Sequence, residues 1–321
     1  MSELVLPDFN DVLQAAARIA PHAEVTPVLR SRVLDVLSDA QLHFKAEHLQ
    51  RGGAFKFRGA CNAVWALAPA QAGLGVVTHS SGNHGAALAM AARTRSVSCN
   101  VVVPEGAVAT KLQNIARHGA TLWHCEPTIE ARERMCMQVQ ARTGACLVHP
   151  YTDAAVIAGQ GTAALELLGQ AEELDVLVVP VGGGGLAAGT ALALRGGAPQ
   201  CDLVLAEPVG AADTARSLAA GERRVEGVPQ TVCDGLRGTL GAPNFAILQV
   251  AKAHVITVDD DATIKAMRLL WQVLKQTVEP SSAIALAAVL SDPARFAGRR
   301  VGIVLSGGNV DIDALPWRDG A

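Results

Sequence analysis

The chain has few aromatic residues, no excess of basic charge and no long apolar run. Aromatic side chains make up 3% of its 321 residues, and 27 basic residues stand against 30 acidic ones. Nucleic-acid binding usually needs cations for the phosphates and aromatic rings for the bases, so nucleic acid is not an expected partner. No run approaches the roughly 18 apolar residues of a membrane helix. The opening MSELVLPDFNDVL has an acidic flank where a signal peptide has a basic one. We therefore expect a soluble, cytoplasmic protein that binds no membrane.

The cysteines show no paired pattern either. There are 7 of them, and none forms a C-x-x-C motif. Neither a disulfide framework nor a zinc site is indicated. Hydrophobic residues make up 50% of the chain, which is ample for a large core.

Two series of short apolar runs alternate with helix-like stretches. The first contains GVVTH, VSCNVVVP, ATLWHC and ACLVHP, and the second contains DVLVVPV, CDLVLAE, HVITV and RVGIVLS. The stretches predicted as helices between them include NHGAALAMAART and TIKAMRLLWQVLKQ. Such alternation predicts βαβ units and parallel sheets. We expect an α/β protein of two lobes, each an open parallel sheet flanked by helices. The predicted domains are a large one, residues 1–74 and 150–321, and a small one, residues 75–149, inserted in it.

The stretch GAFKFRGA places Lys56 between Phe55 and Phe57. Lysine normally keeps its hydrated ammonium group in water. Two flanking rings therefore indicate either the edge of an amphipathic strand or an amine that is withdrawn from water in order to do chemistry.

A run of four glycines follows an expected strand in VLVVPVGGGGLAAGTA. The glycines are Gly182, Gly183, Gly184 and Gly185, and a helix-like stretch begins after them. Backbone N–H groups of such a turn, together with the helix N-terminus, are suited to a phosphate. The alternative is a flexible strand-to-helix turn. Neither a Walker sequence nor G-x-G-x-x-G spacing is present, so a nucleotide is not the first expectation.

Two further polar stretches follow expected strands. THSSGNHGAAL begins a helix with polar groups suited to a carboxylate or phosphate, although simple N-capping by serine is the alternative; its residues are Ser80, Ser81, Gly82, Asn83 and His84. VLSGGNVD places Ser306 at the end of the last strand, where ligands of parallel sheets collect and where a hydroxyl can contact a ring nitrogen.

Read together, these stretches contain the parts that a phosphorylated aldehyde cofactor requires. HLQRGGAFKFRGA, HSSGNHGAAL, HPYTDAAVIAGQGTAALEL, VGGGGLAAG, TVCDGLRGTLG, VEPSSAIALAAVL and SGGNVD, in this order, resemble the serine/threonine dehydratase and serine racemase family. These are pyridoxal phosphate enzymes of the tryptophan synthase β fold, fold type II. The resemblance spans nearly the whole chain. It implies pyridoxal 5'-phosphate as the cofactor, held in the cleft between the two lobes.

The resemblance also implies roles for individual residues. Lys56 is expected to bind the cofactor aldehyde covalently and to move protons at the substrate Cα, with apolar rings and a nearby cation lowering its pKa. Phe55 would pack on the cofactor, Asn83 would hydrogen-bond its phenolic oxygen, and Ser306 its ring nitrogen. Gly182–Gly185 and Leu186 would hold the phosphate. Ser80 through His84 would bind the substrate carboxylate.

The expected reaction is β-elimination of an L-β-hydroxy amino acid such as serine or threonine, giving a 2-oxo acid and ammonia. Ser81 matches the serine of racemase-like members, so racemisation by Lys56 and Ser81 is an alternative. Gly238 and Thr239 stand where racemases often have two serines, which leaves open a bulkier or acidic substrate such as phenylserine or 3-hydroxyaspartate. The non-enzyme alternative is an idle ligand-binding module of the same fold.

Two features outside this centre complete the expectations. LAEPVGAADTARS matches a divalent-cation site made of Glu207, the Ala211 carbonyl and Asp213, an oxygen set suited to Mg²⁺ or Ca²⁺, and the alternative is a solvated acidic turn. The resemblance suggests a homodimer. Of the scattered histidines, His79, His118, His124 and His149 are interpreted as structural.

Overall fold

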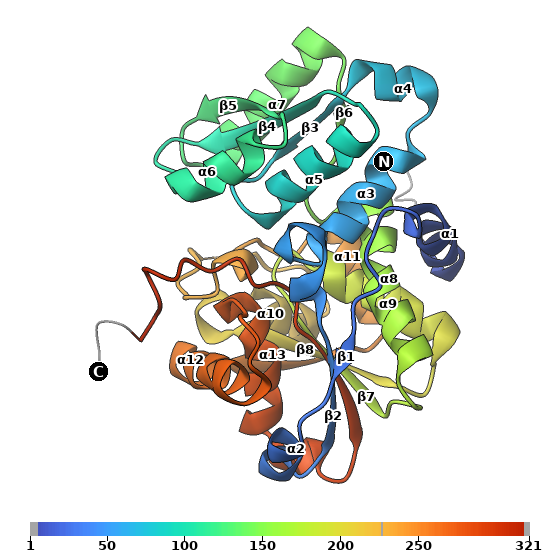
Figure 1. Cartoon of the computed structure of the whole chain (residues 1–321), viewed down its shortest axis with the longest axis vertical. Helices are drawn as coiled ribbons and strands as arrows, with labels where there is room; N and C mark the ends of the chain where they lie inside the picture. Colours follow the sequence, from blue (N-terminus) through green and yellow to red (C-terminus); the bar gives the residue numbers. More distant parts are fainter. Residues whose placement is uncertain (1–5, 226, 318–321) are drawn as a thin grey trace.

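The computed structural model describes residues 6–225 and 227–317 and contains two sheets, each covered by helices (Figure 1). The predicted α/β class is confirmed. Residues 1–5, the first part of the acidic stretch MSELVLPDFNDVL, lie outside the described residues. Within the described ranges, no helix combines the length and apolarity needed to cross a membrane.

The larger sheet has six strands in the order β1-β2-β10-β7-β8-β9. Their bounds are β1 (Val28–Leu29), β2 (Gln41–Lys45), β7 (Val176–Pro180), β8 (Asp202–Pro208), β9 (His254–Val258) and β10 (Arg300–Val304). All neighbours are parallel except β1, which pairs antiparallel with β2 at one edge. The sheet is therefore mixed at this edge, where the sequence predicted parallel strands throughout.

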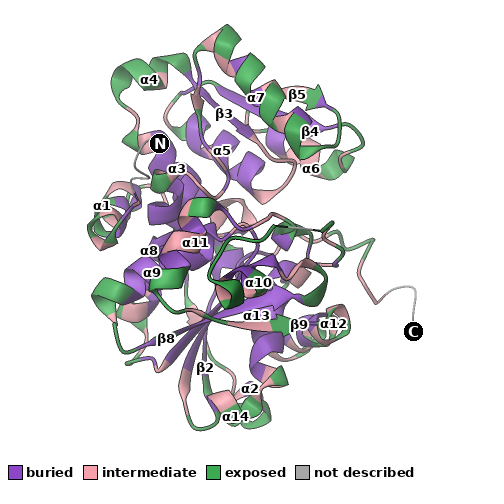
Figure 2. Cartoon of the chain, turned by 180° about the vertical axis from the view of Figure 1, so that it is seen from behind, coloured by how far each residue is buried: buried purple, intermediate pink, exposed green. Residues whose placement is uncertain are grey.

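Both faces of the larger sheet are buried. Along β7, Val176 and Val178 pack into the apolar cluster on one face, and Leu177 and Val179 into the cluster on the other. This period-two alternation inside a continuous apolar run is typical of parallel strands covered on both sides. The strands are buried and the helices around them are exposed on their outer sides (Figure 2). The helices are α1 (Phe9–Ile19), α2 (Arg32–Ser38), α8 (Ala154–Gln170), α9 (Gly185–Gly197), α10 (Asp213–Ala220), α11 (Ala242–Val250), α12 (Asp260–Leu269), α13 (Pro280–Ser291) and α14 (Pro293–Phe296).

The smaller sheet has four parallel strands in the order β5-β4-β3-β6. They are β3 (Val76–His79), β4 (Cys99–Pro104), β5 (Thr121–Cys125) and β6 (Cys146–Leu147), joined by α5 (Asn83–Thr94), α6 (Ala109–Ala116) and α7 (Ile129–Thr143). All of these elements come from residues 76–147. This continuous origin supports the proposed insertion of residues 75–149 between two parts of the larger domain.

Helix α3 (Lys56–Ala66) connects the two sheets and is followed by α4 (Pro69–Leu74). Its apolar side chains, among them Phe57 and Val64, belong to the same buried cluster as Leu88 of α5 and Val101 of β4. The helix also packs against α8 of the larger part. Lys56 is thus the first residue of a helix, so the strand-edge interpretation of GAFKFRGA was wrong.

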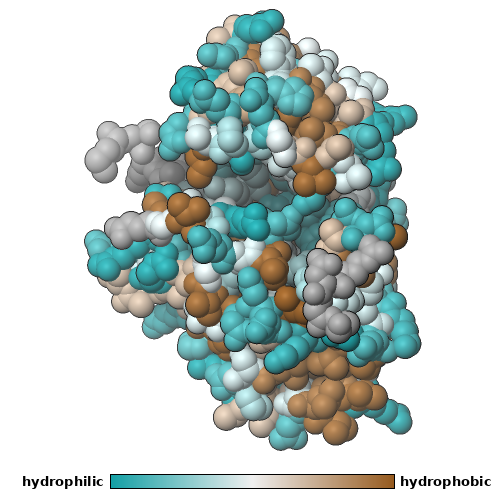
Figure 3. Space-filling model, turned by 90° about the vertical axis from the view of Figure 1, so that its left-hand side faces the viewer, coloured by the Kyte–Doolittle hydropathy of each residue, from teal (hydrophilic) through white to brown (hydrophobic). Residues whose placement is uncertain are grey.

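The carboxyl ends of β3, β7 and β10 face the gap between the two sheets, where the surface is hollowed in the space-filling view (Figure 3). Short 3-10 turns lie in the connections; they are Glu47–Leu49, Arg51–Gly53, Val209–Ala211 and Asp234–Leu236. The last of these carries Asp234, whose carboxylate forms an ion pair with Lys111 of α6. This pair joins the two parts of the molecule beside the hollow.

Candidate active site

A cavity of about 710 Å³ lies between the two sheets. Strand ends of an open parallel sheet are where ligands usually bind. Every residue predicted to bind a cofactor or substrate lines this one cavity: Phe55, Lys56, Ser80, Ser81, Gly82, Asn83, His84, Gly182, Gly183, Gly184, Gly185, Leu186 and Ser306. The structure thus brings together segments that are up to 251 positions apart in the sequence, from Phe55 to Ser306. Their individual roles stay predictions.

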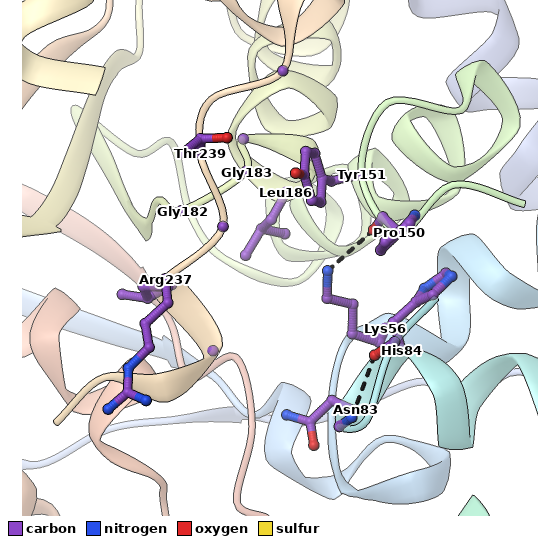
Figure 4. A pocket seen from close by; sticks show the side chains of 18 of the residues that line it. Lys56, Asn83, His84, Pro150, Tyr151, Gly182, Gly183, Leu186, Arg237 and Thr239 are labelled. Atoms are coloured by element: carbon purple, nitrogen blue, oxygen red, sulfur yellow. Dashed lines mark hydrogen bonds between the residues drawn. The ribbon is translucent and has the colours of Figure 1, made fainter. Parts of the chain in front are cut away.

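Lys56 extends into this cavity from the first turn of α3 (Figure 4). Its Nζ donates to the carbonyl of Pro150 at 3.2 Å and lies 5.0 Å from the centroid of the Phe55 ring. Phe57, by contrast, is fully buried in the core of the smaller sheet. The two phenylalanines therefore do different things: Phe55 shapes the cavity and Phe57 anchors the helix.

Burial lowers the pKa of Lys56 from 10.5 to about 8. The nearby charge that acts on this amine is the carboxylate of Glu279, which raises the pKa. The predicted desolvation is present, but the expectation of a nearby cation that lowers the pKa was wrong. An amine with this pKa is partly neutral near neutral pH, as a nucleophile and proton carrier must be.

We expect the rate at which the cofactor-free protein binds pyridoxal phosphate to rise with pH around a midpoint near 8, because only the neutral amine attacks an aldehyde. Stopped-flow absorbance would measure it. In Glu279→Gln the midpoint should fall, because the charge that raises the pKa is removed. A wild-type midpoint near 10.5, the ordinary lysine value, would contradict the desolvation of Lys56.

The polar loop after β3 leads directly into α5, with Gly82 as the residue before the helix. The Gly82 N–H bonds the Ser80 hydroxyl at 3.3 Å. The Asn83 amide donates to both carboxylate oxygens of Glu279, at 3.0 and 3.2 Å, and its oxygen accepts from Asn309 at 3.0 Å. Asn83 therefore ties the start of α5 to the larger part of the molecule, on the side where α13 begins.

Glu279 was missed by the sequence analysis. It precedes α13, lines the cavity and is 6% exposed, and burial raises its pKa to about 7. Its sequence signal was an acidic residue immediately before Pro280 and a strongly apolar helix. A carboxylate in such a place either caps the helix or serves a site, and only the fold shows that it faces Lys56 and Asn83.

Two histidines interpreted as structural also line the cavity. The rings of His79 and His149 meet edge to face at 5.1 Å between centroids, and Tyr151 continues the contact at 4.6 Å from His149. Burial lowers the pKa of both imidazoles to about 4, so both are neutral near pH 7. Their interpretation as structural stays a prediction, and their place in the cavity wall was not expected from the sequence. His79 ends β3 and His149 follows β6, and the carboxyl ends of these strands meet here because the strands are adjacent.

The four-glycine turn joins β7 to α9. Gly184 has φ of +91°, a backbone conformation that favours glycine. A Cβ on Gly182 would lie 2.7 Å from the Leu236 Cα, and one on Gly183 would lie 2.5 Å from the Tyr151 ring. Within residues 6–225 and 227–317, the N–H groups of Gly182 through Leu186 donate to no protein acceptor. A turn with free donors, a helix N-terminus and an amine nearby fits a phosphorylated aldehyde such as pyridoxal phosphate.

The predicted cation ligands lie outside the cavity, as expected. Glu207 and Asp213 are 0% and 6% exposed. The Glu207 carboxylate accepts from the N–H groups of Thr214 and Ala215 at 2.7 and 2.8 Å, and burial raises its pKa to about 7. The described residues contain no cluster of three or more His, Cys, Asp or Glu side chains able to hold a metal. That the two carboxylates and the Ala211 carbonyl together bind a cation stays a proposal.

Comparison with known proteins shows the family to which the chain belongs. The family described as "Pyridoxal-phosphate dependent enzyme" matches residues 19–307. The chain is 46% identical over 314 residues to beta-hydroxyaspartate dehydratase of Paracoccus denitrificans (strain Pd 1222), covering 98% of this chain and 100% of that one. It is 46% identical over 313 residues to serine racemase of Arabidopsis thaliana, covering 96% and 95%. The structure matches maize serine racemase with a TM-score of 0.94 at 43% identity, covering 96% and 95%. The chain therefore belongs to the pyridoxal-phosphate-dependent enzymes, in the serine racemase and hydroxyaspartate dehydratase group of fold type II.

Proposed function

We propose that this enzyme catalyses β-elimination of an L-β-hydroxy amino acid, releasing a 2-oxo acid and ammonia. The observation that carries the proposal is the buried amine of Lys56, with a pKa of about 8, in the cavity that also contains the glycine turn. Pyridoxal phosphate, when bound, supplies the electron sink for loss of the Cα proton. Lys56 takes that proton. The β-hydroxyl then leaves with proton assistance, and the released enamine is hydrolysed by water to the 2-oxo acid and ammonia.

The remaining cavity residues bind and orient. We assign the phosphate to the N–H groups of Gly182–Gly185 and Leu186, and the substrate carboxylate to the loop from Ser80 to His84. Ser306 would face the ring nitrogen, Asn83 the phenolic oxygen and Phe55 the ring face. A neutral hydroxyl at the ring nitrogen withdraws fewer electrons than a charged partner would, which suits elimination over transamination.

An acidic substrate is favoured by Arg132 of α7. Arg132 lines the cavity, and its buried Nε has no hydrogen-bond partner among the described residues. A dianionic amino acid would give this side chain a carboxylate partner, which serine and threonine cannot supply. The relative from Paracoccus denitrificans acts on β-hydroxyaspartate by its name. We therefore place a 3-hydroxyaspartate first, with Arg132 binding its β-carboxylate.

Replacing Arg132 with Gln tests this assignment. We expect kcat/KM for 2-oxo acid formation from L-threo-3-hydroxyaspartate to fall about 100-fold, the loss of one hydrogen-bonded charge pair, while L-serine changes little. Arg134→Gln is the matched control, since Arg134 lies on the same helix, is 59% exposed and does not line the cavity. An equal loss for both substrates would remove Arg132 from substrate selection.

Racemisation is the second candidate, because Ser81 lines the same cavity as Lys56 and offers a second proton carrier. The Arabidopsis and maize relatives are serine racemases. A two-base exchange would pass the Cα proton between Lys56 and the Ser81 hydroxyl, without loss of the β-substituent. Elimination is placed first because Arg132 and the name of the Paracoccus denitrificans relative favour a dehydratase of a 3-hydroxyaspartate.

We further propose that Glu207, the Ala211 carbonyl and Asp213 bind Mg²⁺ or Ca²⁺, because two buried carboxylates are costly without a cation. In chelator-treated protein, millimolar Mg²⁺ or Ca²⁺ should raise Tm by about 2–5 °C. Asp213→Asn should lose this response. Glu222→Gln, at a carboxylate that is 67% exposed, should keep it. A wild-type Tm that neither ion changes would refute the site.

The assembly and location are proposals of the same kind. We propose a homodimer with a small amino acid as its ligand, and a cytoplasmic location. Sedimentation and cell fractionation would test them.

A further inference from the structure

We propose that Asn244 is a positioning residue that fixes the orientation of the glycine turn, and through it the enzyme's preference for a phosphorylated cofactor. Asn244 lies in the first turn of α11 and is 0% exposed. It is absent from the residues that line the cavity. Any effect on the cofactor must therefore pass through a neighbour.

The Asn244 amide makes two bonds that bring two walls of the cavity together. Its Nδ2 donates to the Gly183 carbonyl at 2.5 Å and to the Tyr151 carbonyl at 2.9 Å. The Gly183 carbonyl also accepts the N–H of Gly241 at 3.1 Å. One side chain thus holds the turn after β7 and the segment after β6 in a single arrangement.

Because a peptide unit is planar, the bonds to the Gly183 carbonyl also fix the direction of the Gly184 N–H. The Gly183 carbonyl and the Gly184 N–H belong to one peptide unit and point in opposite directions. Holding the carbonyl toward Asn244 therefore holds the N–H away from it. Gly184 lines the cavity, and its N–H donates to no protein acceptor among the described residues. The two hydrogen bonds to the carbonyl hold the N–H in the orientation that binds an anion. The peptide therefore does not have to rotate when the anion binds.

The local conformation makes such a clamp necessary. Gly184 has φ of +91°, and glycine peptides rotate more freely than any others. Without a fixed carbonyl, the peptide between Gly183 and Gly184 could turn its N–H away from the cavity. The neighbouring contact is close, because a Cβ on Gly184 would lie 2.8 Å from the Cβ of Asn244. Asn244 therefore packs against the turn as well as bonding to it.

The inference rests on the proposed placement of the phosphate at the turn, and the experiment separates the two. The dissociation constants of pyridoxal 5'-phosphate and of pyridoxal are measured by absorbance titration of cofactor-free protein, for the wild type, Asn244→Ala and Asn244→Val. The valine variant leaves no cavity at this position and removes the donor. Gln249→Ala is the control, because Gln249 lies on the same helix and donates to the Gly221 carbonyl at 3.2 Å.

We expect the Kd of pyridoxal phosphate to rise at least about tenfold in both Asn244 variants, the effect of losing a buried donor, while the Kd of pyridoxal changes less than twofold. Gln249→Ala should match the wild type. Equal weakening of both ligands, or no weakening in the folded valine variant, would overturn the inference. A wild type that binds both ligands alike would instead overturn the placement of the phosphate.

Discussion

Lys56→Ala should abolish turnover. The variant loses both the amine that binds the cofactor aldehyde and the base for the Cα proton, so we expect the rate to fall by about 10⁴-fold or more, the upper end of what one proton-transferring side chain contributes. The visible absorbance of the lysine-bound cofactor should disappear with it. Steady-state assay of 2-oxo acid formation and an absorbance spectrum of the purified variant would measure both losses.

Lys56→Arg is the informative companion to this variant. Arginine keeps a positive charge in the cavity but does not lose its proton in proteins. We expect it to be as inactive as the alanine variant, with a Tm close to that of the wild type. A Lys56→Ala protein with substantial turnover would remove Lys56 from the mechanism.

Arg58→Met should destabilise the enzyme strongly. Arg58, two positions after Lys56, is 2% exposed and donates through Nε and one terminal nitrogen to the two carboxylate oxygens of Glu47, both at 2.7 Å. Glu47 is fully buried, and the other terminal nitrogen of Arg58 lies 2.7 Å from Glu166. The methionine variant leaves the Glu47 carboxylate without its cation. We expect the free energy of unfolding to fall by about 3–5 kcal/mol, measured by urea denaturation.

Two comparisons separate this effect from a general cost of losing an ion pair. Adding Glu47→Gln to Arg58→Met should recover part of the loss, because the unpaired charge is removed. Arg224→Met breaks a pair of the same 2.7 Å length with Glu222, but these side chains are 51% and 67% exposed. It should cost less than about 1 kcal/mol. Equal losses for Arg58→Met and Arg224→Met would contradict the role of burial.

Elements with a strong local pattern were predicted well from the sequence. The predicted helix NHGAALAMAART coincides with α5, and the runs DVLVVPV and HVITV contain β7 and β9. Elements whose bounds depend on contacts with the rest of the fold were predicted less well. The stretch TIKAMRLLWQVLKQ was predicted as one helix, but α12 begins earlier, at Asp260, because Asp259 caps it, and it ends in a π-helical turn over Leu270–Leu274. The two-residue strand β1 is too short to give a pattern.

The residues of the candidate site also differ in whether the sequence predicted them. Lys56, the glycine turn and the loop from Ser80 to His84 were found because each has a motif that carries its own chemistry. Glu279, Arg132 and Asn244 have no such motif. Arg132 is one of several charged residues along α7, and only the fold shows that Arg132 lines the cavity while Arg134 is 59% exposed. The idle-module alternative loses support, because the chain belongs to an enzyme family and keeps the lysine.

The most direct test of the proposed reaction is a proton NMR time course in D₂O. The purified enzyme, with pyridoxal phosphate and Mg²⁺, is given L-threo-3-hydroxyaspartate, L-serine or L-threonine in separate tubes. We predict a growing 2-oxo acid signal, fastest with L-threo-3-hydroxyaspartate. Loss of the Cα proton signal from L-serine with the rest of the amino acid intact, and no 2-oxo acid from any of the three substrates, would contradict elimination and favour racemisation in its place.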